Sequence, residues 1–189
     1  MGDGSDMKLG IALGIAACFS LAAADTNEMV PPAGPGVFTS KQVGPGTFKL
    51  VVAGHTFTSR GDIEKYLAYR AARLTIEQDA AWFTFKEDRG KGDTAEPVPV
   101  RDPEGLRYSF RMKYFRPVWR YQVNGSAAWT RWSPFSGAAF ISADPKTITG
   151  FEVSAEIVVH KGPMDDADPL AFEVHALSDL LVNQVSPPK

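Results

Sequence analysis

The residues of this chain that could do chemistry are concentrated between positions 106 and 135, where basic and aromatic side chains alternate and no acidic residue occurs. An arginine over an aromatic ring can hold phosphate or sugar groups, and a guanidinium binds carboxylates through two hydrogen bonds. The pattern therefore predicts a surface that binds anionic polymers or lipid head groups. The residues expected to form it are Arg107, Arg111, Lys113, Arg116, Arg120, Trp119 and Trp129.

The same segment also fits a purely structural role. Its aromatic side chains can fill a core while its basic side chains stay solvated, or pair with Glu152 and Glu156 across a sheet. Both interpretations stay open at the level of sequence.

Other residue types that support catalysis or metal binding have the wrong spacing. The histidines His55, His160 and His175 are far apart and follow no zinc-binding pattern. Glu152 and Glu156 would lie on one strand, roughly 13 Å apart, which exceeds the separation of glycosidase carboxylates. The chain has no nucleophile elbow, phosphate loop or dinucleotide fingerprint. We therefore predict no catalytic residues, no metal site and no cofactor.

The first 24 residues have the parts of an export signal. Lys8 precedes an apolar run, Leu9–Leu21, and small residues follow. Two processing sites fit: cleavage after Ala24, or a bacterial lipobox that would lipidate Cys18. Cys18 is the only cysteine, so the mature domain would have no disulfide. We expect an exported protein on the periplasmic side of the envelope, with the membrane as a partner through a lipid on Cys18.

The next segment, residues 25–46, is rich in proline and glycine and predicts an extended tether. A single domain is expected over residues 47–183, followed by a disordered tail over residues 184–189. The formal net charge of -2 requires no polyanionic partner, and export makes nucleic acid an improbable ligand. Nothing in the sequence indicates an oligomeric state.

Two amphipathic helices are predicted within the domain. In the first, Ser59 is the expected N-cap, and an apolar stripe faces one side while Glu64 faces away from it. The second is expected to begin at Asp168-Pro169, because aspartate caps helices and proline suits the first helical position. The two apolar stripes are Ile63, Leu67, Ala71 and Leu74, and Leu170, Val174, Leu177 and Leu181.

Alternation of apolar and polar residues predicts the strands. Asn124-Gly125 is a typical hairpin turn between two short strands. The predicted strands are residues 47–53, 82–86, 107–114, 118–123, 126–132 and 147–159. Because regular strand–helix alternation is missing, the order favours an α+β fold, with a mostly antiparallel four- to five-stranded sheet and two helices packed on one face.

Several blocks of the chain together resemble an uncharacterised family of small bacterial envelope lipoproteins of unknown function. The resemblance covers roughly residues 46–183. It implies a lipidated cysteine near the N-terminus, here Cys18, and it brings no catalytic residues with it. The blocks are Val52–Arg60, Tyr66–Thr75, Trp82-Phe83, Glu152–Pro163 and Asp168–Phe172.

These observations predict a non-catalytic envelope protein that acts by binding or by structural interaction. The alternative is a hydrolase or transferase acting on cell-wall material, with an active site assembled from dispersed residues. A concave pocket that gathers a histidine with a carboxylate would favour the enzyme, and a flat basic sheet face would favour binding.

Overall fold

A computed structural model of the chain describes residues 37–55, 59–86, 108, 111–134, 141, 143–164 and 168–188. All of them belong to one compact unit. The predicted export signal with Cys18, the first part of the predicted tether and the site residue Arg107 lie outside the described residues.

The fold is α+β, as predicted, and its sheet is antiparallel. The described part holds seven strands rather than the four or five expected. The strands are β1 (Val37–Gly44), β2 (Thr47–Gly54), β3 (Trp82–Lys86), β4 (Val118–Val123), β5 (Thr130–Trp132), β6 (Ile148–His160) and β7 (Ala171–Glu173); the helices are α1 (Arg60–Glu77) and α3 (Val174–Leu181), with a short 3-10 turn at Pro145–Thr147.

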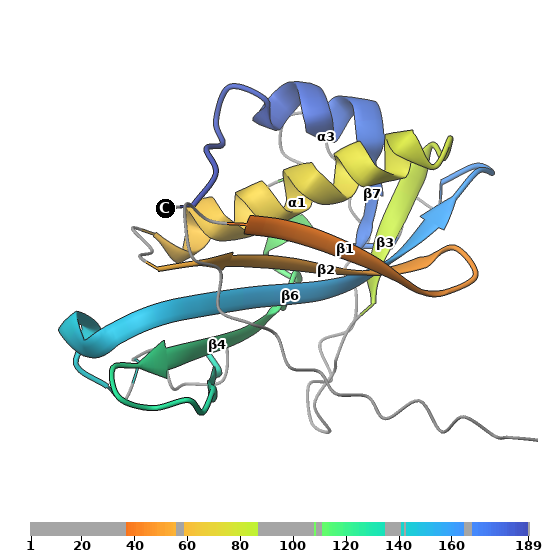
Figure 1. Cartoon of the computed structure of the whole chain (residues 1–189). Helices are drawn as coiled ribbons and strands as arrows, with labels where there is room; N and C mark the ends of the chain where they lie inside the picture. Colours follow the sequence, from red (N-terminus) through yellow and green to blue (C-terminus); the bar gives the residue numbers. More distant parts are fainter. Residues whose placement is uncertain are drawn as a thin grey trace, which may run out of the picture. The chain divides into compact units, whose positions relative to one another are not determined.

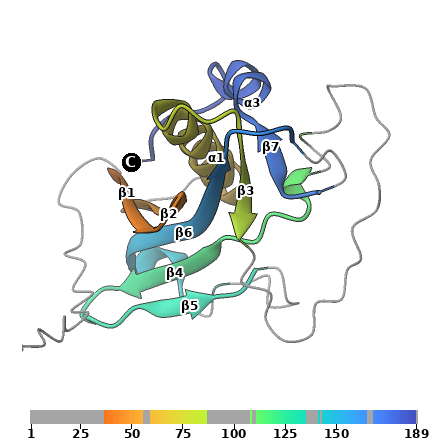
Figure 2. The ribbon, with the colours of Figure 1, turned by 90° about the vertical axis from the view of Figure 1, so that its right-hand side faces the viewer.

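The long strand β6 holds the sheet together (Figure 1). One of its edges pairs with β2, which in turn pairs with β1. Its other edge is shared by two strands placed end to end. There β4 pairs with the first part of β6 up to Ser154, and β3 pairs with it from Glu156 onward. Ala155 lies between the two, and the sheet forks at this point, with β4 and β5 diverging from β3 and β7 (Figure 2).

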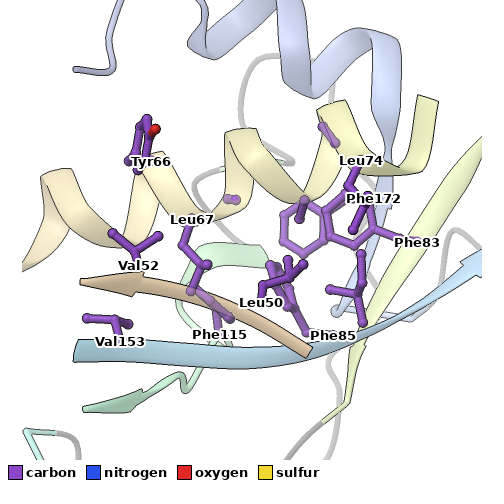
Figure 3. Close-up of a cluster of buried hydrophobic side chains, with 14 of the residues drawn as sticks. Leu50, Val52, Tyr66, Leu67, Leu74, Phe83, Phe85, Phe115, Val153 and Phe172 are labelled. Atoms are coloured by element: carbon purple, nitrogen blue, oxygen red, sulfur yellow. The ribbon is translucent and has the colours of Figure 1, made fainter. Parts of the chain in front are cut away.

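Both helices lie on one face of the sheet, and α1 crosses it directly (Figure 1). The predicted stripe of α1 is confirmed, because Ile63, Leu67, Ala71 and Leu74 are all buried. Figure 3 shows side chains of the sheet directed at this stripe. Alternate strand residues point to the same face, so one face collects most of the apolar set. Neither α1 nor α3 covers the other face, which we call the open face. The labelled sheet residues are Leu50, Val52, Phe83, Phe85, Val153 and Phe172.

Two boundary predictions are wrong. Val37–Gly44, assigned to the tether, forms the edge strand β1, because Gly46 takes a positive φ of 62° and closes a hairpin onto β2. The predicted disordered tail is also ordered in part: Val185 packs against the core and Pro188 is buried. The prediction for residues 37–44 relied on composition, and β1 carries few apolar residues because it is almost entirely exposed.

Two element types are also corrected. Tyr108, Arg111 and Met112 have helical backbone, so a strand over 107–114 is not formed. The second helix begins later than Asp168, because the chain first adds the short strand β7 to the sheet. The carboxylate of Glu173, not that of Asp168, then accepts hydrogen bonds from the first backbone N–H groups of α3.

Candidate functional site

The predicted basic aromatic surface does not form as one surface, because its members lie on both sides of the sheet. Arg111 is only 4 % exposed and donates to the backbone carbonyls of Asp168 and Ala171. Trp119 is 1 % exposed, on the face of β4 that α1 covers. The prediction is therefore wrong for these two residues. Lys113 and Arg116 are exposed.

Arg120 points to the open face of the sheet and is held in place there. Its Nη2 lies 2.7 Å from Oε2 of Glu152, its cross-strand partner, and its guanidinium stacks on the ring of Trp129 at 4.9 Å. This ion pair with Glu152 agrees with the structural role that the sequence also allowed for the basic segment. Glu156 also forms an ion pair, but with Lys86, at 3.3 Å, rather than with a residue of the basic block.

The registers bring further basic residues onto the open face in two rows that run across the strands. Paired residues point to the same face of a sheet, so each row is a line of neighbours. Together the rows carry five cations and two carboxylates. One row is Lys41, Lys49, Glu156 and Lys86, and the other is Ala53, Glu152, Arg120 and Arg131.

A pocket of about 420 Å³ opens where the sheet forks, between the end of β3 and the start of β4. Two stacked rings, Phe85 and Phe115, whose centroids are 4.0 Å apart, form its apolar wall. Three cations line the same pocket, namely Lys49, Lys86 and Arg116, with Glu156 as the carboxylate among them. We call this site the fork pocket. An excess of positive charge beside an apolar wall suits an anionic group attached to an apolar or sugar moiety.

A second group of interest lies on the buried side of α1. Glu64, predicted to face solvent, is 7 % exposed, and its Oε1 accepts from Nε1 of Trp119 at 3.1 Å. Burial raises the pKa of the Glu64 carboxyl, while Arg60, at 3.3 Å, and Trp119 oppose the rise. Tyr108 lies near enough that burial and the charge of Glu64 both raise the pKa of its phenol. A carboxyl group with a raised pKa stays protonated at a higher pH than usual and can then act as an acid.

Sequence reasoning missed Glu64 because its partner is 55 positions away. One signal could have been used: Glu64 directly follows Ile63, the first residue of the apolar stripe, and a wide stripe includes such a position.

The histidines do not join the fork pocket. His160 stacks on Trp82 with ring centroids 3.9 Å apart, and its Nε2 lies 3.2 Å from Oγ1 of Thr84. Burial lowers the pKa of His160, although Asp168 opposes this. Nδ1 of His55 lies 3.0 Å from the carbonyl oxygen of Thr149. Within the described ranges, no three His, Cys, Asp or Glu side chains gather as a metal site would require.

Comparison of the chain with protein-family models, with curated proteins and with solved structures found no match. Among the described residues, no helix has the length and apolar character needed to cross a membrane.

Proposed function

We propose that this chain is an exported, non-catalytic protein of the bacterial envelope, held at the membrane through a lipid on Cys18, and that it binds anionic groups of the envelope at the fork pocket. The shared chemistry of the ligand is a phosphate or carboxylate carried on a lipid head group or a cell-wall polymer. Membrane anchoring rests on the leader pattern and on the family resemblance, and binding rests on the geometry of the open face.

One observation carries the binding proposal: Lys49, Lys86 and Arg116 line a single pocket in which Glu156 is the carboxylate. Lys86 and Glu156 form a pair whose side chains are 55 % and 41 % exposed, so solvent screens their mutual attraction. Lys49 and Arg116 line the same pocket, so its described lining carries more positive than negative charge. Lys41 extends the same row beyond the pocket, which suits an extended anionic surface better than a single small ion.

The test is co-sedimentation of the purified chain with vesicles that contain phosphatidylglycerol and, separately, with isolated cell-wall sacculi. We expect binding to one of the two at low salt and loss of binding as salt rises. The double variant Lys49→Gln, Lys86→Gln should bind about thirtyfold more weakly, since each cation near an anionic surface contributes roughly 1 kcal/mol.

The matched control removes the same charge from α1, on the covered side of the sheet, with Lys65→Gln and Arg73→Gln. This control should bind like the unchanged protein. Equal losses in both double variants would show that only net charge matters and would refute the fork pocket as the site. Absence of binding to both materials at low salt would refute the proposal as a whole.

The alternative, a hydrolase or transferase acting on cell-wall material, is favoured by one observation only. Glu64 is a buried carboxyl with a raised pKa, a property common among catalytic acids. Release of soluble fragments from sacculi by the unchanged protein, and loss of that release in the Glu64→Gln variant, would support this alternative in place of binding.

A further inference from the structure

A second pocket, of about 260 Å³, lies beside α3 and shares no described lining residue with the fork pocket. Its apolar lining comes from Met164, Phe172, Leu177 and Leu180. Its polar lining includes Tyr108 and Arg111, which come from the helical segment next to β7 (Figure 2). We call this site the α3 pocket.

The hydroxyl of Tyr108 is the first indication that the α3 pocket holds a ligand. It is buried and has no hydrogen-bond partner among the described residues. A buried hydroxyl without a partner is unfavourable, and such groups usually indicate that a water or a ligand atom completes the site. Because Tyr108 lines the pocket, a molecule that enters it can supply the missing acceptor.

Arg111 gives the pocket a positive charge, and the carboxylate of Glu173, which also lines the pocket, is already engaged by the backbone N–H groups of His175 and Ala176. Its guanidinium is almost fully buried and is fixed by the backbone carbonyls of Asp168 and Ala171. A guanidinium carries five N–H donors and attracts acceptor oxygens strongly in a buried setting. Tyr108 and Arg111 therefore both favour a ligand oxygen.

The rest of the pocket favours a hydrocarbon chain. Phe172 and Leu177 are buried at its wall, while Leu180 stays 38 % exposed. Pockets for drug-sized ligands begin near about 300 Å³, so a smaller ligand is expected here. We infer that the α3 pocket binds a short acyl chain, with its carbonyl or carboxylate oxygen at Tyr108 and Arg111 and its hydrocarbon against α3.

The test is calorimetric titration of the full chain with octanoate and with octanamide, kept below the concentration at which octanoate forms micelles. Both carry the acyl oxygen, but only octanoate is charged. Binding of both supports recognition of the carbonyl oxygen, and binding of octanoate alone supports recognition of the carboxylate through Arg111. Absence of binding of both probes at millimolar concentrations would overturn the inference.

Two variants locate the site. Tyr108→Phe should weaken binding about tenfold, as expected for one lost hydrogen bond to the ligand, while leaving the thermal midpoint of the free protein unchanged or higher. Leu180→Lys should also weaken binding about tenfold, because it charges the apolar rim.

The matched control is Val182→Lys, at an exposed position of the same turn that does not line the pocket. Wild-type affinity in both Tyr108→Phe and Leu180→Lys, or an equal loss in Val182→Lys, would contradict the proposed site.

Discussion

The two faces of the sheet are built from the same strands but treat charge in opposite ways. On the face that α1 covers, the carboxylate of Glu64 is buried and is satisfied by Trp119 and Arg60. On the open face, Glu152 and Glu156 each stand among cations in a cross-strand row. Trp119 and Arg120 are neighbours in the chain, yet they lie on opposite faces because side chains alternate along a strand. The charge of Glu64 is therefore buried in the core, while the open face carries both a buried ion pair, Arg120–Glu152, and an exposed one, Lys86–Glu156.

The largest expected effect is a loss of stability on the covered face, compared with the exposed edge strand β1. Phe83 is fully buried and packs against Phe172, with ring centroids 5.5 Å apart. Phe83→Ala should lower the free energy of unfolding by about 3–5 kcal/mol, because it leaves a cavity in the core. Val43→Ala, at a residue 47 % exposed on β1, should change it by less than about 0.5 kcal/mol. Urea denaturation of both variants measures the difference, and similar losses would contradict the layered core.

The second prediction compares the two ion pairs of the open face, Arg120–Glu152 and Lys86–Glu156. Glu152 is 3 % exposed, so Arg120→Met would leave its charge buried without its ion-pair partner. We expect a loss of about 2 kcal/mol, below the roughly 3–5 kcal/mol of fully buried pairs, since Arg120 is 27 % exposed. Lys86→Met breaks only an exposed pair and should cost less than about 1 kcal/mol. Thermal unfolding measured side by side decides this, and a larger loss for Lys86→Met would reverse our assignment.

The smallest effect concerns the proton on Glu64. Because burial raises its pKa in the fold, the unfolded chain loses this proton near the ordinary value of 4.5 while the folded chain keeps it. The contribution of Glu64 to stability is therefore full below that value and is lost as pH rises through the raised pKa. Glu64→Gln keeps an acceptor for Trp119 but cannot ionise.

The unfolding free energy of the unchanged protein, relative to the Glu64→Gln variant, should consequently fall as pH rises from 4.5. Denaturation curves at several pH values, followed by tryptophan fluorescence, give this difference directly. Parallel curves for the two proteins would show that Glu64 titrates as it does in the unfolded chain.

The sequence correctly predicted the strands and the helix that bury one side, because burial of one side sets their pattern of apolar residues. The alternation in β2 and β6 and the stripe of α1 follow from one buried side each, and the strand over Trp82–Lys86 has the predicted bounds. The edge strand β1 was missed because it buries almost nothing. The helical segment at Arg111 was mistaken for a strand, since polar and apolar residues alternate there by chance.

The candidate sites were harder to predict because they depend on register. The row that joins Lys49, Glu156 and Lys86 exists only because β2 and β3 flank β6 at that residue, and nothing local in the sequence specifies this. The burial of Arg111 and Glu64 likewise depends on partners that are distant along the chain.

The central position of β6 has a consequence for the order in which this protein can assemble. Strands β2, β3 and β4 all pair with a strand that follows them in the chain, so during synthesis none of them finds this shared neighbour until β6 has emerged. Folding must then close several long loops at once, which makes it slow. A nascent chain whose sheet stays incomplete until β6 has been made would suit the passage across a membrane that we propose for it.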